Sequence, residues 1–294
     1  MRVAILGCGY VGLALARQLS AAGHHPVGVR RSDAGLAAVR DAGVEAVRAD
    51  VTDADSLAAV PDVDAAVFAA SSGGRDAESA RRVYVDGLRT AVDAFGTRSD
   101  PPAQFVYTSS TGVYGDHGGD WVDESTAPRP TTARTRALAE AERVARERPA
   151  EHGMAGRVVR FAGLYGPDRY RIERYLDGPV VEGYVNLLHR EDAAGAVRFA
   201  LTETAEPVLL AVDNEPVARP ALAAWLADAC GVPRPDVATR SARLDAGADG
   251  ESARRRLATD KRASNRLLRS LGYAFAYPTF REGYADAVRA VRGT

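Results

Sequence analysis

Three glycines near the start of the chain constrain its fold more than any other feature. The motif Gly7-x-Gly9-x-x-Gly12 follows a short apolar run at residues 3–6 and opens a segment whose apolar residues recur at helical spacing up to Gly23. Glycines at this spacing permit a tight turn and close backbone approach, so that a pyrophosphate can bind at the N-terminus of the helix. The motif predicts a dinucleotide site, and the alternative is a purely structural turn.

Alternating strand and helix patterns extend this beginning into a larger unit. Strands are expected at residues 3–6, 25–29, 44–48, 63–70, 104–108 and 156–161, and helices at residues 34–42, 53–60, 78–95 and 132–148. This alternation predicts an α/β fold, a Rossmann-type doubly wound parallel sheet with right-handed crossovers. We expect residues 1–162, with later contributions from about 185–204, to form an NAD(P)-binding domain. Residues 163–184 and 205–294 are expected to form a smaller C-terminal substrate-binding region.

The charge balance and the scarcity of some residue types exclude several functions. The 38 basic and 39 acidic residues give a net charge of -1, which excludes attraction of the whole surface to nucleic acid or to an anionic membrane. No apolar run approaches the roughly 20 residues of a membrane span, and a first strand starting at Arg2 leaves no signal peptide, so a cytoplasmic protein is expected. Cys8 and Cys230 are far apart, and the only close histidines are His24-His25, so neither a disulfide framework nor a metal site is expected.

The end of the second expected strand bears on the choice of cofactor. An NAD site usually has an acidic residue there, which binds the ribose 2′-hydroxyl. Here the strand ends in Arg30 and Arg31, and the first acid is Asp33. Two guanidinium groups attract a 2′-phosphate, so NADP is expected in preference to NAD. The alternative is that both side chains only point into solvent.

Residues at the ends of further strands complete the expected cofactor site, since ligands of such sheets bind at the carboxyl ends of the strands. Asp50 and Val51 suit the adenine edge, with the Asp50 carboxylate accepting a hydrogen bond from the exocyclic amine. The alternative is a helix cap before Asp53. The expected cofactor-binding residues are Gly7, Gly9, Tyr10, Val11, Gly12, Arg30, Arg31, Asp50, Val51, Ala69, Ala70, Ser71, Thr108 and Phe161.

Four motifs occur in the order typical of one enzyme family. The motifs are residues 105–115 (FVYTSSTGVYG), 159–167 (VRFAGLYGP), 186–192 (NLLHRED) and 261–265 (KRASN). They resemble successive segments of extended short-chain dehydrogenases/reductases, the NAD-dependent epimerase/dehydratase family. This resemblance covers nearly the whole chain and implies a Rossmann fold and a nicotinamide cofactor. The opening glycine motif is also similar to that of UDP-sugar 6-dehydrogenases. That family needs a longer chain and a late catalytic cysteine, whereas Cys230 lies on an apolar helix face.

The chain departs from the epimerase/dehydratase family at the catalytic pair. The family has a Tyr-x-x-x-Lys motif, whose phenol transfers a proton and whose ammonium lowers the phenol pKa and binds the nicotinamide ribose. The matching positions here are Thr132 and Arg136, and the only lysine, Lys261, has no tyrosine four residues before it. A threonine hydroxyl is too weak an acid to replace a phenol. The resemblance implies that Arg136 binds the ribose and Ser110 hydrogen-bonds the reacting oxygen, with a turn contact as the alternative for Ser110.

Other side chains are candidates for the missing proton donor. The tyrosine candidates, in order of preference, are Tyr165, then Tyr114, with Tyr170 and Tyr175 following in the substrate region. Each of these has aromatic packing as its alternative. His189 is a further titratable candidate, and its alternative is a hydrogen bond that ties its segment to Asp192.

Together these features predict an NADP-dependent oxidoreductase or epimerase-like enzyme that acts on a small hydroxylated or sugar-like substrate. The alternative is an NADP-binding sensor or regulatory protein that has lost its chemistry. Arg169, Arg171 and Arg174 either bind an anionic group of the substrate or form a solvated helix face. By resemblance, a homodimer is expected through the helices at 78–95 and 132–148, and no nucleic-acid or membrane partner is expected.

Overall fold

The computed structural model describes residues 1–73, 76–245 and 259–293, and the chain divides into two compact units. The first unit comprises Met1–Val113, Pro130–Arg160 and Ala193–Leu209. The second comprises Tyr114–Arg129, Phe161–Asp192 and Leu210–Thr294. Each unit is therefore assembled from three separate segments of the chain.

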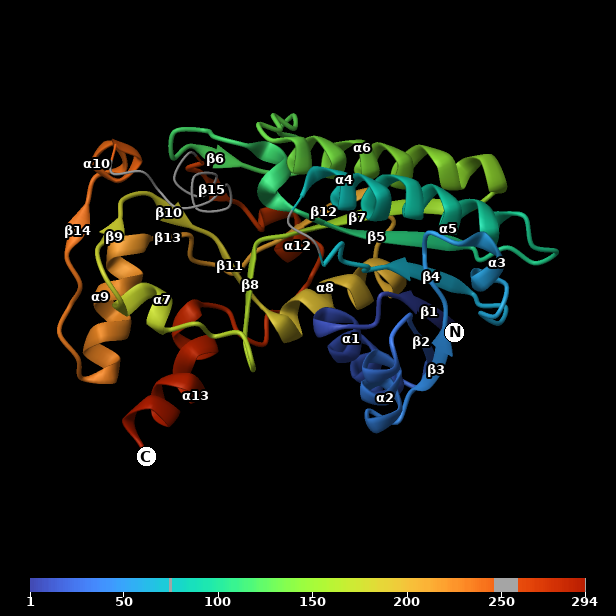
Figure 1. The fold of residues 1–294 in the computed structure, drawn as a ribbon, viewed down its shortest axis with the longest axis horizontal. Helices are drawn as coiled ribbons and strands as arrows, with labels where there is room; N and C mark the ends of the chain where they lie inside the picture. Colours follow the sequence, from blue (N-terminus) through green and yellow to red (C-terminus); the bar gives the residue numbers. More distant parts are fainter. Residues whose placement is uncertain (74–75, 246–258, 294) are drawn as a thin grey trace. The chain divides into compact units, whose positions relative to one another are not determined.

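The first unit is built on a seven-stranded sheet with the order β12-β7-β5-β4-β1-β2-β3 (Figure 1). Its strands are β1 (Arg2–Leu6), β2 (His25–Arg30), β3 (Glu45–Arg48), β4 (Ala65–Phe68), β5 (Gln104–Ser110), β7 (Ala155–Phe161) and β12 (Val208–Ala211). The β1–β2, β1–β4, β2–β3 and β4–β5 ladders are all parallel. Every residue of β4 is buried, as its continuous apolar run requires of a strand covered on both faces. The predicted Rossmann-type sheet is confirmed.

Helices cover both faces of this sheet (Figure 1). The helices α1 (Tyr10–Ala21) and α2 (Asp33–Asp41) lie on one side, and α4 (Ala77–Arg81), α5 (Gly87–Gly96) and α6 (Ala133–Glu147) lie on the other. The short helix α3 (Ala54–Leu57) precedes β4, and α8 (Arg190–Thr202) precedes β12. Four of these helices, α2, α3, α4 and α6, begin after a capping residue. The side chains of Ser32, Asp53, Asp76 and Thr132 each accept a hydrogen bond from a backbone N–H in the first turn of the helix that follows.

The helix expected at 78–95 differs from a regular α-helix in its middle. Residues Arg82–Asp86 form a π-helical segment, η1, between α4 and α5. A π turn takes up one more residue than an α turn, so it changes the face to which the enclosed side chains point. The hydrophobic spacing does not reveal this, because Val83, Tyr84 and Val85 are buried together.

Within the described residues, the second unit contains four two-stranded ladders. Three ladders are parallel, β8 (Gly163–Tyr165) with β11 (Leu187–His189), β9 (Val180–Val181) with β14 (Val237–Ala238), and β6 (Trp121–Val122) with β15 (Arg262–Ala263). The antiparallel ladder joins β10 (Tyr184–Val185) to β13 (Val217–Ala218). The helices described in this unit are α7 (Glu173–Leu176), α9 (Arg219–Cys230), α10 (Arg240–Asp245), α12 (Arg266–Ser270) and α13 (Phe280–Arg292). Its core contains Tyr165, Leu222, Leu226, Phe280 and Tyr284.

Residues 114–129 and 185–192 belong to the second unit, whereas the sequence pattern grouped them with the cofactor-binding region. The reason lies in long-range pairing. The loop after β5 carries β6, whose partner β15 lies about 140 residues later, and the backbone N–H of His117 donates to the carbonyl of Asp260 at 2.9 Å. Such pairing between distant segments leaves no local pattern in the sequence.

Three further features belong to the described residues as a whole. Within them, no helix is long and apolar enough to cross a membrane. No group of three or more histidine, cysteine, aspartate or glutamate side chains in the same part of the chain is placed to hold a metal ion. Cys8 and Cys230 are both buried free thiols.

Candidate functional site

The glycine-rich turn after β1 has the geometry of a phosphate cradle. Gly7 has a φ of +90°, and a Cβ at this position would lie 2.4 Å from the Cα of Ala70, so only glycine fits. Gly9 is the N-cap of α1 and contributes no side-chain cap, which leaves the first-turn amides of Tyr10, Val11 and Gly12 directed at the space before the helix. A helix N-terminus of this kind stabilises a phosphate group.

This turn lies at the point where the strand order reverses. β1 pairs with β2 on one side and with β4 on the other, and the connections leave in opposite directions from there. Ala69 donates its N–H to the carbonyl of Leu6 at 2.8 Å, so Ala69, Ala70 and Ser71 run directly beside the glycine turn. In open α/β sheets, ligands bind outside the carboxyl ends of the strands at such a reversal. The structure therefore brings two of the predicted groups of cofactor residues together.

The two arginines at the end of β2 occupy different positions. The Arg30 guanidinium lies over the glycine turn, because a Cβ at Gly9 would be 2.6 Å from its Nη1 and one at Gly35 would be 2.4 Å from its Nε. Arg31 is exposed, and its Nη1 lies 3.5 Å from Oδ2 of Asp50. Arg30 thus contacts the turn that the motif assigns to the cofactor, whereas Arg31 pairs with Asp50 after β3.

Asp50 forms a turn of its own after β3. Its Oδ1 accepts hydrogen bonds from the N–H and the hydroxyl of Thr52, at 3.0 and 2.8 Å. Burial alone raises the pKa of this carboxyl, but the Thr52 hydrogen bonds and the Arg31 charge outweigh it and lower the pKa. The cap of α3 is Asp53, whose carboxylate accepts from Asp55 and Ser56. The carboxylate of Asp50 is therefore ionised at neutral pH and can accept a hydrogen bond from an adenine amine, and its neighbour Val51 is buried.

The predicted residues at the end of β5 have local hydrogen bonds. The Thr108 hydroxyl donates to the carbonyl of Phe68 on β4 at 3.3 Å. Ser110 is half-buried, and its Oγ accepts from the N–H of Gly112 at 3.1 Å, the turn contact that the sequence left open. This bond occupies a lone pair of the oxygen and leaves the hydroxyl proton able to reach a ligand. Phe161, at the end of β7, is buried.

The start of α6 contains both positions of the family's catalytic pair. Thr132 is the N-cap, and it forms a reciprocal capping box with Thr135. Arg136 is exposed. The arginine that reaches inward is Arg134, two residues earlier, which donates to the Ser72 hydroxyl at 3.2 Å and to the Tyr84 hydroxyl at 2.6 Å. No sequence motif distinguishes Arg134, Ser72 or Tyr84 from neighbouring residues.

The preferred tyrosine candidate, Tyr165, lies in the core of the second unit. It is 2% exposed and stacks on Tyr284 with ring centroids 4.7 Å apart. Burial, together with the nearby Asp213 carboxyl, raises the pKa of the Tyr165 phenol well above its ordinary value. The next candidate, Tyr114, is fully buried and donates to the carbonyl of Asp123 at 2.6 Å. These contacts favour the packing alternative for both residues. Tyr170 and Tyr175 pack against the same core.

His189 and Asp192 lie in the same unit but not in the pairing that the sequence suggested. Nδ1 of His189 accepts from the N–H of Glu191 at 3.3 Å, and burial lowers the pKa of the ring to about 4. Asp192 instead accepts from the Tyr273 hydroxyl and from the N–H groups of Ala276 and Tyr277. His189 is therefore neutral near neutral pH, and Asp192 ties α8 to the C-terminal segment.

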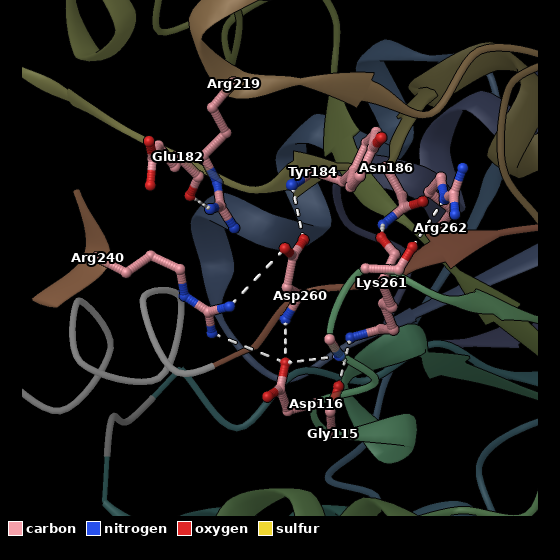
Figure 2. Close-up of polar contacts among 12 residues, drawn as sticks. Gly115, Asp116, Glu182, Tyr184, Asn186, Arg219, Arg240, Asp260, Lys261 and Arg262 are labelled. Atoms are coloured by element: carbon pink, nitrogen blue, oxygen red, sulfur yellow. Dashed lines mark hydrogen bonds and ion pairs between the residues drawn. The ribbon is translucent and has the colours of Figure 1, made fainter. Parts of the chain in front are cut away.

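Lys261 is enclosed in a network of charged groups (Figure 2). Its Nζ donates to the carbonyl of Gly115 at 3.0 Å, and burial lowers its pKa to about 8. The adjacent Asp260 accepts from the N–H of Tyr184 at 2.7 Å and donates its own N–H to Asp116 at 2.6 Å. Arg240 lies 3.7 Å from each of these two carboxylates. The Lys261 ammonium therefore joins two segments of the second unit that are 146 residues apart.

The arginine cluster at 169–174 follows a segment with unusual backbone conformation. Asp168 and Arg171 have φ values of 64° and 52°, the left-handed region that non-glycine residues rarely adopt. Arg169 is half-buried, whereas Arg171 and Arg174 are exposed. Conformations of this kind cluster at ligand-binding sites, although this cluster fits a solvated face equally well.

Comparison with known proteins decides the family. The model of the NAD dependent epimerase/dehydratase family matches residues 3–207. The chain belongs to this family. Protein YeeZ of Escherichia coli (strain K12) is 35% identical over 208 residues, which cover 68% of this chain and 73% of YeeZ. The family expected from the ordered motifs is confirmed.

Solved structures of other family proteins share the fold over the full length of the chain. A Methylobacillus flagellatus protein assigned to the NAD-dependent epimerases/dehydratases is 30% identical, covers 99% of this chain and 98% of its own, and has a TM-score of 0.77. A human epimerase family protein solved with NADPH is 18% identical, covers 100% of both chains and has a TM-score of 0.74. At that identity the human protein shows only that the fold is shared.

Proposed function

We propose that this chain is an NADP-dependent oxidoreductase or epimerase that acts on a small hydroxylated or sugar-like substrate. The observation that carries the proposal is the Arg30 guanidinium lying over the glycine turn, with Arg31 directly after it at the end of β2. A 2′-phosphate next to the turn would find two positive groups there, whereas a bare 2′-hydroxyl would find no acidic acceptor at the strand end.

The residues of the first unit fit a nicotinamide dinucleotide. The cradle at Gly7, Gly9 and Gly12 is a space that a Cβ would fill, and the α1 amides face it. The bound cofactor would accept or donate a hydride. Asp50 would accept from the adenine, and Ser110 would hydrogen-bond the substrate oxygen. Arg136 would reach the ribose hydroxyls from the first turn of α6.

The cofactor assignment is tested by fluorescence titration of NADPH and NADH. Replacing Arg30 and Arg31 together by alanine should weaken NADPH binding by about tenfold or more and leave NADH binding nearly unchanged, because only NADPH carries the extra phosphate. The matched control is Arg40→Ala, an exposed arginine at the far end of α2. Equal loss of affinity for both cofactors would contradict the NADP assignment.

We also propose that the chain forms a homodimer through α4–α5 and α6. These helices pack against each other on one face of the sheet (Figure 1). Glu140 of α6 pairs with Arg81 and Arg89 at 2.6 and 3.0 Å. The outer face of α6 is charged, with Arg143 paired to Glu147. Light scattering at micromolar concentration should give twice the 31.1 kDa chain mass, and a monomer mass would rule the dimer out.

A further inference from the structure

One tyrosine of the first unit has contacts that set it apart from the tyrosines described above. Tyr84 lies in the π-helical segment η1, and its hydroxyl accepts a hydrogen bond from Nη2 of Arg134 at 2.6 Å. The Ser72 hydroxyl lies 3.4 Å from the same oxygen and accepts from Nη1 of Arg134 at 3.2 Å. The phenol oxygen is therefore the meeting point of three elements, the segment after β4, η1 and α6.

These contacts stabilise the charged form of the phenol. Burial by itself raises the pKa of Tyr84, but the Ser72 hydrogen bond and the Arg134 charge outweigh it and lower the pKa. The titratable groups that face it from other elements are Arg134 on α6 and Tyr107 on β5. Tyr107 shows the contrast, because its fully buried hydroxyl has no hydrogen-bond partner within the described residues and burial raises its pKa well above the ordinary value.

The location of Tyr84 in the first unit supports a chemical role. Ser72 directly follows Ala69, Ala70 and Ser71, which run beside the glycine turn at the strand-order reversal. Tyr84 is 7% exposed, so its phenol is largely shielded from water. Single π turns within longer helices occur frequently at functional sites. Its hydroxyl lies 3.4 Å from the hydroxyl of Ser72, in the segment that follows the carboxyl end of β4.

We propose that Tyr84 is the proton-transferring phenol of this protein and that Arg134 is the residue that positions it and stabilises its phenolate. The proposal rests on the proposed function. When a substrate alcohol is oxidised, its carbon loses a hydride to the bound NADP⁺ and its hydroxyl proton passes to the Tyr84 phenolate, which gives a carbonyl, NADPH and a neutral phenol. In the reverse direction the phenol returns the proton to the carbonyl oxygen. The phenol thus comes from η1 in a chain that has threonine at the family's tyrosine position.

The test follows tyrosine ionisation by NMR of ring-labelled protein, in the presence of NADP⁺ or NADPH. In the wild type, one of the 11 tyrosines should titrate at a lower pH than the others. That step should be absent in Tyr84→Phe and should move up by about one pH unit or more in Arg134→Gln, which removes the adjacent charge. Arg134→Lys keeps a positive charge and should retain the low midpoint. Tyr107→Phe is the matched control and should leave the step in place.

The oxidation state of the cofactor provides the second measurement. The nicotinamide ring is positively charged only in NADP⁺, so a neighbouring phenol should ionise at a lower pH with NADP⁺ than with NADPH. A purely structural Tyr84 would not respond to this change. If the low step persists in Tyr84→Phe, or if NADP(H) binds without any difference between its two forms, this proposal is overturned and the proposed function stands. If neither form binds, the proposed function fails and this proposal fails with it.

Discussion

At the residue scale, Ser110 combines a local contact with an expected chemical role. Its Oγ accepts from the N–H of Gly112, and the side chain is half-buried at the carboxyl end of β5. A hydroxyl held in this way keeps its proton for a second partner. The turn contact and the hydrogen bond to a substrate oxygen are therefore compatible.

Replacing Ser110 by alanine should lower kcat by about 10²-fold or more on the first substrate that turns over, because a lost transition-state hydrogen bond costs a few kcal/mol. NADPH affinity, measured by fluorescence titration, should be nearly unchanged. Losing the bond to Gly112 should lower the thermal midpoint only slightly, since a single neutral hydrogen bond contributes about 1 kcal/mol. Equal turnover by the variant and the wild type would remove Ser110 from the site.

At the element scale, a buried ion pair fixes α6 on the sheet. Glu142 lies on the buried face of α6, and its carboxylate is bound by Arg160 of β7 at 2.7 Å and by the Ser109 hydroxyl of β5 at 2.6 Å. The two charged side chains are 5% and 3% exposed. The spacing of apolar residues along α6 does not predict a charge at this position, because its partner comes from a different strand.

Arg160→Met should destabilise the protein by about 3–5 kcal/mol, because it leaves the Glu142 carboxylate buried with no counter-charge. Urea unfolding measures this loss. The double variant Arg160→Met/Glu142→Leu should recover most of it, since the uncompensated charge is gone. Arg143→Met, which breaks the exposed Arg143–Glu147 pair, is the control and should change stability by less than about 0.5 kcal/mol. Equal effects of the two single substitutions would contradict this account.

At the scale of the whole molecule, buried titratable groups of the second unit make stability depend on pH. Burial raises the pKa of Asp213 to about 8, and Oδ2 of this side chain has no hydrogen-bond partner within the described residues. Between pH 3.8, the ordinary pKa of the group, and about 8, the folded state therefore keeps a proton on Asp213 that the unfolded state has released. His189 acts in the opposite direction between about 4 and 6.5, where only the unfolded state is protonated at the ring.

Between pH 6.5 and about 8, Asp213 is the one of these two groups whose protonation differs between the folded and unfolded states. From pH 6.5 to about 8 the unfolding free energy should fall as pH rises, by up to about 2 kcal/mol, because the unfolded state binds fewer protons than the folded state. Asp213→Asn, which resembles the protonated acid, should abolish this fall. Above pH 8 the curve should turn upward, because Lys261 loses its proton earlier in the folded state. Denaturant midpoints across this range are the measurement, and the same slope in both proteins would contradict the assignment.

The sequence alone determined the features that depend on neighbouring residues. The glycine turn, the alternation of strands and helices, and the continuous apolar run of β4 are local patterns, and each predicts its element because backbone conformation and burial periodicity act over a few residues. The ordered motifs indicated the family, because each motif is a short run of consecutive residues. The position of Arg30 and Arg31 at the end of β2 could also be predicted, because these residues directly follow the expected strand in the sequence.

Only the tertiary structure decided which polar side chains meet. Tyr84, Ser72 and Arg134 are separated by 12 and 50 residues, and η1 changes the direction of Tyr84 without changing the apolar pattern. Tyr165 was preferred from its position after a strand, but its surroundings are set by α13, more than 100 residues later. Lys261 meets Gly115 across 146 residues. Contacts of this range depend on how elements pack, and packing is a property of the folded chain that no local pattern records.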